Sequence, residues 1–318
     1  MGLVRILLPL PRAAAKWAPE KGGPLLGAAL SYCVTPSWAG LPPPSPARRL
    51  AWAEEAVEVY RGTADTEGLS RALALRAHAL LLSGRFEEAC TAATAVPGEA
   101  SWVLTAFVGD VRAQALAGVG RTEEAVSVAQ ACVEAYRQLS APDRRDRALG
   151  SLPGALRTYG MLLAAVGRSE ESVAVYEECA ALLAAMSLRE LAHVELVRPQ
   201  VLAELVGVLR VLERYGDALG VGPEAREALR GPLAWAVPEI VLPLRVRLLI
   251  DLARCHTATG DPAEARACAV AAVAEARKPH GASELTSALD CLADVLGELG
   301  QTDKESITRR ELAELRDS

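Results

Sequence analysis

The chain has 318 residues, of which 51% are hydrophobic, 23% charged and only 4% aromatic. Its formal net charge of −6 argues against a general attraction to nucleic acid or to anionic membranes, and neither is expected as a partner. The apolar residues are mainly Ala, Leu and Val. Because Ala and Leu are strong helix formers while sheets favour β-branched and aromatic residues, the composition predicts an all-α fold.

Residues 1–45 differ in composition from the rest of the chain. The apolar run at residues 6–10 is short and interrupted by Pro9, unlike the core of a secretory signal. A second apolar run, at 24–34, is shorter than the roughly 20 residues that span a bilayer. The stretch 36–46 is rich in proline, which is incompatible with a helix interior. We therefore predict a Pro-rich, poorly ordered N-terminal segment at 1–45; a Pro-rich ligand for an aromatic groove is the alternative.

Helical periodicity begins after residue 46, where Leu50, Ala53, Val57 and Tyr60 fall on one helix face. This segment is typical of the second helix of a hairpin, without a convincing first helix before it. Five or six better copies of a helical hairpin come after it. Each has an apolar helix, a short turn, and a second helix that opens with acidic residues and a small residue. The turns are centred on residues 84, 120, 167, 213, 260 and 300.

The turn residues have a physical explanation. Glycine ends the first helix because the left-handed conformation needed there disfavours a side chain. Thr122 and Ser169 are expected to cap the second helix, followed by acidic residues that suit the positive end of its dipole. Glu213 replaces the glycine in the fourth copy, which predicts a differently built turn. Glu305 replaces the small residue in the sixth copy, which predicts a terminal copy that faces water.

The hairpin resembles the tetratricopeptide repeat, in a long version similar to actinobacterial-type repeats. The third copy carries the pattern best, with the matching residues Leu156, Tyr159, Gly160, Leu163, Gly167, Ser172, Tyr176 and Cys179. The resemblance covers about residues 70–316. It implies a right-handed superhelical solenoid of about five to six antiparallel helix pairs over 46–318, with a concave groove lined by the first helices.

Family geometry also implies which side chains face that groove. The expected set comprises Arg71, His78, Gln114, Arg157, Met161, Arg210, Arg247, Arg254, Asp290 and Asp294, and the same frame places Phe107 and Asp110 beside them. The groove would thus have a basic middle and an acidic far end. We expect it to hold an acidic peptide clamped by Arg157, Arg210 and Arg254, because guanidinium groups can bind carboxylates bidentately. In the alternative, these arginines are solvated or pair with Glu204, Asp251 or neighbours within the array.

The sequence indicates no catalytic, metal or cofactor site. No P-loop, H-E-x-x-H or G-x-S-x-G motif occurs, and the four histidines lie in different copies. His256 occupies a core-type position and is interpreted as a packing residue. The seven cysteines stand singly, which argues against a disulfide framework or thiolate zinc site and favours buried thiols in a reducing, cytoplasmic compartment.

We therefore expect a non-enzymatic scaffold that binds a protein or peptide of unknown identity and that could self-associate. The alternative is a regulatory or sensor module of a signalling or transcription-control system, responding to a peptide or small ligand.

Overall fold

The computed structural model describes residues 9–17, 19–34, 45–97, 101–138, 151–186, 196–230 and 237–316. These residues form fifteen α-helices, one short 3₁₀ helix and no strand, so the predicted all-α fold is confirmed. The chain divides into two compact units, residues 1–167 and 168–318, each of which is described by itself. No helix in the described ranges has the length and apolar character needed to cross a membrane.

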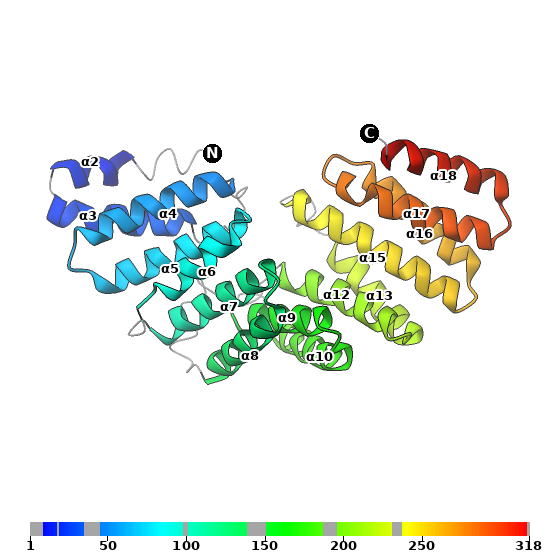
Figure 1. The fold of residues 1–318 in the computed structure, drawn as a ribbon, viewed down its shortest axis with the longest axis horizontal. Helices are drawn as coiled ribbons and strands as arrows, with labels where there is room; N and C mark the ends of the chain where they lie inside the picture. The colour runs from blue at the N-terminus through cyan, green and yellow to red at the C-terminus, as the bar shows by residue number, and fades with distance from the viewer. Residues whose placement is uncertain are drawn as a thin grey trace. The chain divides into compact units, whose positions relative to one another are not determined.

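In the first unit, helices that follow one another in the chain pack side by side (Figure 1). The first helices of successive pairs also contact one another, α5 with α7 and α7 with α9. The unit comprises α2 (Pro9–Trp17), α3 (Pro19–Val34), α4 (Pro46–Arg61), α5 (Thr66–Leu82), α6 (Phe86–Thr94), α7 (Trp102–Gly118), α8 (Thr122–Gln138) and α9 (Leu152–Ala165).

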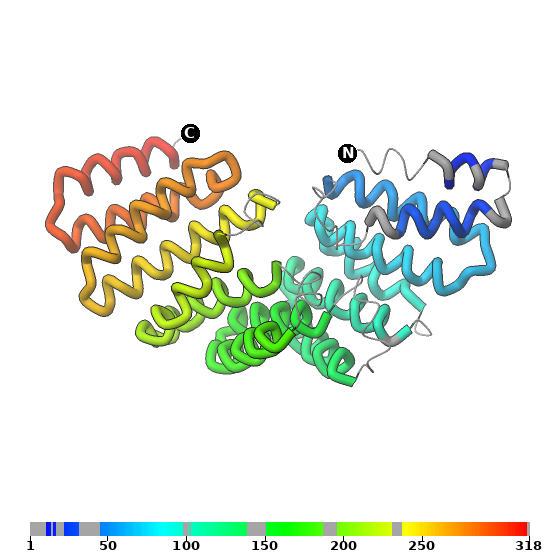
Figure 2. Tube along the Cα trace, turned by 180° about the vertical axis from the view of Figure 1, so that it is seen from behind, coloured from blue at the N-terminus to red at the C-terminus, as the bar shows by residue number. Residues whose placement is uncertain are grey.

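The second unit repeats this arrangement, and the tube in Figure 2 shows its helices from behind. Its first helices α12, α15 and α17 contact one another in order, and each also packs against the second helix of its own pair. The unit comprises α10 (Ser169–Ala185), α12 (Val197–Val211), α13 (Tyr215–Ala228), α15 (Pro238–Ala258), α16 (Pro262–Ala276), α17 (Leu285–Glu298), α18 (Thr302–Arg316) and the 3₁₀ helix Ala282–Glu284.

All six predicted turns are left-handed at their central residue. The five glycines have φ between 66° and 83°, and Glu213 has φ 58°. At Glu213 the backbone N–H donates to the carbonyl of Arg210 (3.0 Å), and the N–H of Arg214 donates to Leu209 (2.9 Å). The same pair of bonds closes the turn at Gly84. The prediction of a differently built fourth turn is therefore wrong, because Glu213 adopts the glycine conformation.

The second helices do not begin with the predicted caps. Ser169 is already the first residue of α10, and the capping position belongs to Arg168, whose side chain makes no capping hydrogen bond. Thr122 has the corresponding place in α8. After four of the six turns, an arginine instead forms an ion pair with the acidic residue three positions later. The four pairs are Arg85–Glu88, Arg121–Glu124, Arg168–Glu171 and Arg214–Asp217. Such exposed pairs contribute little to stability.

Within the N-terminal segment 1–45, the structure describes two helices, α2 and α3; residues 1–8, 18 and 35–44 lie outside the described ranges, and the predicted poor order of the segment stays a prediction. Helix α3 is packed against the array, since its Leu26 and Leu30 lie in one apolar cluster with Tyr60 of α4. Gly27 lets the helices approach closely, because a Cβ there would lie 2.6 Å from the Tyr60 ring. Helix α3 thus supplies the first helix that the pattern before α4 lacked.

The small residue after each turn packs where the helices of a pair approach most closely. Ala89, Ala125, Ser172, Ala218 and Ala265 are fully buried, as predicted. Glu305 is not turned simply to water. Its carboxylate lies where a Cβ on Gly297 of α17 would meet it at 3.1 Å, and it pairs with Arg309. The absence of a side chain at Gly297 therefore makes room for the larger residue.

Candidate functional site

The predicted groove residues of the first unit lie on the first helices α5, α7 and α9. His78 of α5 packs its ring against Phe107 of α7, with ring centroids 5.6 Å apart. His78 Nδ1 is buried and has no hydrogen-bond partner among the described residues. Burial, aided by the charge of Arg49, lowers the pKa of His78 to about 4. The imidazole is therefore neutral at physiological pH.

Asp110 of α7 is the second polar group in this row. Gln114 donates a hydrogen bond to its Oδ2 (3.0 Å), whereas Oδ1 is buried without a hydrogen-bond partner among the described residues. Burial raises the pKa of Asp110 to about 6, and polar neighbours together with the charge of Arg157 on α9 oppose this shift only in part. The structure therefore brings the predicted residues Gln114 and Arg157 into one electrostatic neighbourhood around Asp110. Arg71 and Met161 are half-buried on α5 and α9.

In the second unit, Arg210 of α12 is held by Asp251 of α15. Arg210 Nε donates to Asp251 Oδ1 at 2.6 Å, and the two side chains are only 27% and 18% exposed. Asp251 lies against Gly207, where a Cβ would meet its carboxylate at 3.2 Å. Burial raises the pKa of Asp251, opposed by Arg210 and by Arg254 and Arg247. This pairing is the one that the alternative interpretation predicted for Arg210.

Arg247 and Arg254 lie on the same side of α15 as Asp251, at helical spacings of four and three residues. Arg247 pairs with Glu284 (3.2 Å), yet its side chain remains 61% exposed. Arg254 is exposed and forms no ion pair with the described residues. We call Arg210, Arg247, Arg254 and Asp251 the basic face. It carries more positive than negative charge, and two of its guanidinium groups reach water.

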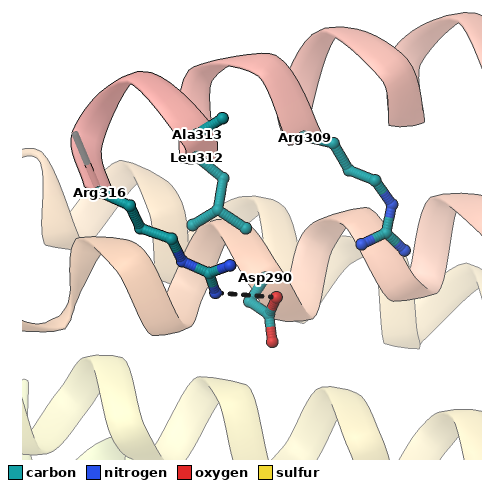
Figure 3. Close-up of a pocket in the computed structure, with 5 residues that line it drawn as sticks. All are labelled: Asp290, Arg309, Leu312, Ala313 and Arg316. Carbon is teal, nitrogen blue, oxygen red and sulfur yellow. Dashed lines mark ion pairs between the residues drawn. The ribbon is translucent and has the colours of Figure 1, made fainter.

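The predicted acidic end is neutralised by the last helix. Asp290 and Asp294 of α17 lie opposite Arg316 (3.7 Å) and Arg309 (3.2 Å) of α18. Figure 3 shows Arg316 directed at Asp290 below the side chain of Leu312. These three residues line a cavity of about 350 Å³ together with Ala313 and Arg309. These pairs are exposed and therefore weak. They nevertheless leave little net negative charge for a cationic ligand at this end.

The structure thus brings Arg210, Arg247 and Arg254 together in the second unit, and His78, Gln114 and Arg157 into a row in the first. The clamp that combines Arg157 with Arg210 and Arg254 draws on both units and stays a prediction.

One cluster was missed by sequence reasoning. His256, Glu264 and Cys268 converge at the fifth turn, although His256 was interpreted from the sequence as a packing residue. Residues 256 and 264 lie symmetrically about Gly260, and residues 264 and 268 are one helical turn apart. Hairpin symmetry was therefore a usable signal.

Known repeat proteins share both the turns and the helix pairs of this chain. A tetratricopeptide repeat family model matches residues 70–93 and 246–271, and each match contains one of the left-handed turns. The chain contains tetratricopeptide-type repeats. No curated protein sequence matches the chain.

Three solved structures share this repeat architecture. The apo form of RapI has a TM-score of 0.61 at 11% identity, covering 86% of this chain and 72% of that one. A Rap protein complexed with Competence and Sporulation Factor has a TM-score of 0.57 at 12% identity, covering 92% and 74%. NprR in complex with its cognate peptide NprX has a TM-score of 0.54 at 9% identity, covering 82% and 71%. At such identities the likeness shows the fold of the repeat array alone.

Proposed function

We propose that this repeat protein is a non-catalytic scaffold that binds an acidic peptide or an acidic segment of a protein. The observation that carries the proposal is the basic face. Its ion pair between Arg210 and Asp251 is partly buried and fixes one guanidinium group, while Arg254 and Arg247 extend beside it into water. A ligand carboxylate would meet one guanidinium group that is already positioned and two that can turn towards it.

The arrangement also decides which arginines to change. Reversing Arg210 would place a glutamate beside the half-buried Asp251, and repulsion between two carboxylates would destabilise the array itself. Arg254 is exposed and forms no ion pair with the described residues, so it can be reversed with much less effect on folding. Arg247 is exposed too, but its reversal places a glutamate beside Glu284, so the folding of the variant is checked by its thermal melt. The variant of choice is therefore the double substitution Arg247→Glu with Arg254→Glu.

A random-peptide display selection on the intact chain tests the proposal. We expect enrichment of peptides rich in Asp and Glu, and a loss of at least tenfold in their affinity for the double variant. The matched control is Arg266→Glu with Arg310→Glu, which changes the net charge equally at exposed positions of the second helices α16 and α18. Selected peptides that bind the double variant as tightly as the natural chain would exclude the basic face.

A second candidate is a regulatory or sensor module that responds to a peptide. The structural likeness to NprR, whose structure contains its cognate peptide NprX, favours this candidate. The two candidates differ in the effect of binding on conformation. A sensor changes conformation with its ligand, so a selected peptide would alter hydrogen exchange across several repeats, whereas a scaffold would be protected only around the basic face.

A further inference from the structure

The fifth repeat carries a cluster of potential metal ligands at its turn. His256 lies in the last turn of α15, while Glu264 and Cys268 lie four residues apart on α16. One donor atom from each of the three side chains lies within 4.8 Å of those of the other two. Donor atoms around a tetrahedral zinc ion are about 3.3–3.8 Å apart, so modest side-chain rotation would close the three around one ion.

The other five copies show that these residues are not required by the turn. Four positions before the turn centre, every other copy has a buried leucine: Leu80, Leu116, Leu163, Leu209 and Leu296. Only the fifth copy has a histidine there, and this imidazole is 20% exposed. The backbone role is unchanged, because the His256 carbonyl accepts the same bond from the residue after the turn centre, at 2.9 Å. The histidine therefore differs from the buried leucine of the other copies in a way that helix packing does not explain.

A second departure lies just after the turn centre. Four copies place there the arginine that pairs with the acidic residue three positions later. The fifth copy has Asp261 instead, so Glu264 has no such arginine. Asp261 Oδ1 accepts the backbone N–H of Glu264 (3.2 Å), and its Oδ2 lies 3.6 Å from His256 Nδ1. The acidic residue that an arginine neutralises in four copies is not neutralised in this way in the fifth copy. There, two carboxylates lie beside an imidazole and a thiol.

We propose that His256, Glu264 and Cys268 bind a zinc ion or another borderline-soft divalent cation, with Asp261 as the carboxylate that orients His256. Imidazole nitrogen, thiolate sulfur and carboxylate oxygen are the donors that zinc takes in proteins, and a ligating histidine commonly faces a carboxylate with its other nitrogen. Cys268 is buried, whereas Glu264 is exposed, so the ion can enter from water on the glutamate side and keep a water molecule as its fourth ligand.

Binding must release the thiol proton, since the thiolate is the ligand: Cys–SH and Zn²⁺ give Cys–S⁻–Zn²⁺ and H⁺. Because the thiol must lose its proton before it can bind, the affinity for the ion should rise with pH.

The test uses the untagged, fully reduced chain titrated with Co²⁺ and then with Zn²⁺. We expect one Co²⁺ per chain with a thiolate-to-cobalt charge-transfer absorption, which Zn²⁺ abolishes, and release of one proton. Cys268→Ser should remove the charge-transfer absorption. His256→Leu and Asp261→Arg give the fifth copy the residues of the others, so both should fold, and each should weaken binding by about 10–100-fold or more.

Cys291→Ser is the matched control, because Cys291 is also a buried thiol of the second unit but belongs to no such cluster among the described residues. It should bind Co²⁺ with unchanged affinity and spectrum. The proposal is overturned if the natural chain shows no thiolate-to-cobalt absorption, or if Cys268→Ser or His256→Leu binds as tightly as the natural chain. Loss of the absorption in Cys291→Ser alone would likewise overturn it, by assigning the metal to another thiol.

Discussion

Replacing Asp110 by asparagine should stabilise the first unit at neutral pH. Burial raises the pKa of Asp110 from 3.8 to about 6, so the folded state favours the protonated acid. The contribution of the protonated Asp110 to the free energy of unfolding is therefore fully present below about pH 4, and it is lost as the pH rises through 6. At 1.36 kcal/mol per pKa unit, the loss approaches about 3 kcal/mol at pH 7. An asparagine side chain would not titrate, and its carbonyl oxygen could still accept the hydrogen bond from Gln114.

The measurement is urea denaturation of both proteins between pH 3.5 and 7.5, followed by far-UV circular dichroism. The asparagine variant should gain stability relative to the natural chain by about 3 kcal/mol across this range, most of it between pH 4 and 6. His78 titrates over an overlapping range with the opposite sign, because its lowered pKa makes the folded state lose stability as the pH falls from 6.5 to 4. That contribution is common to both proteins and cancels in the difference.

Two comparisons make the result decisive. Asp303→Asn changes an exposed acid on α18 and controls for the exchange of acid for amide. Because repeat arrays can unfold in parts, hydrogen exchange of α7 should show the same difference locally. A difference between the Asp110 variant and the natural chain that stays constant with pH would refute the reasoning, since it would mean that Asp110 titrates alike in the folded and unfolded states.

Two further pairs of substitutions test the turn conformation and the helix packing. Glu213→Gly should raise the free energy of unfolding by about 0.5–1 kcal/mol, because glycine tolerates φ 58° without steric cost, a gain that exceeds its greater freedom in the unfolded chain. Gly260→Ala should lower the free energy of unfolding. The check is that the two substitutions shift the denaturation midpoint in opposite directions. Gly27→Ala should destabilise the chain by about 1–3 kcal/mol, since its Cβ would lie 2.6 Å from the Tyr60 ring. Gly220 lies on an open helix surface, so Gly220→Ala should stabilise the chain by up to about 1 kcal/mol. If both alanine substitutions had the same effect on thermal melting, the close contact between Gly27 and the Tyr60 ring would be contradicted.

The fold could be predicted well because its signals are local. A glycine that must be left-handed, a small residue five positions later and a helical apolar period all act within one hairpin. The predictions failed where a residue adopts a conformation that its type usually disfavours. Glu213 adopts a left-handed conformation that is usual for glycine. Helix α3 was not predicted from the sequence because Pro24 and the glycines around it are poor helix formers. Burial of Leu30 outweighs that poor propensity.

The site was harder to predict because it depends on contacts between helices. Spacing alone placed Arg210 and Arg254 on exposed first-helix faces, but whether an arginine is available depends on the neighbouring helix. Asp251 reaches Arg210 only because Gly207 leaves space between α12 and α15. Arg254, one turn further along α15, has no such neighbour among the described residues. Two arginines on neighbouring first helices thus differ: Arg210 forms a structural ion pair, whereas the guanidinium group of Arg254 is exposed to water.

The fifth repeat carries both proposed features, and helix geometry keeps them separate. Arg254 and His256 are two residues apart, which is about 200° around the helix axis, so they project from nearly opposite sides of α15. Arg254 belongs to the side that faces along the row of first helices, whereas His256 turns towards α16. A charge reversal at Arg254 should therefore leave cobalt binding unchanged, and His256→Leu should leave peptide binding unchanged. If either substitution affected both ligands, the two features would have to be treated as one site.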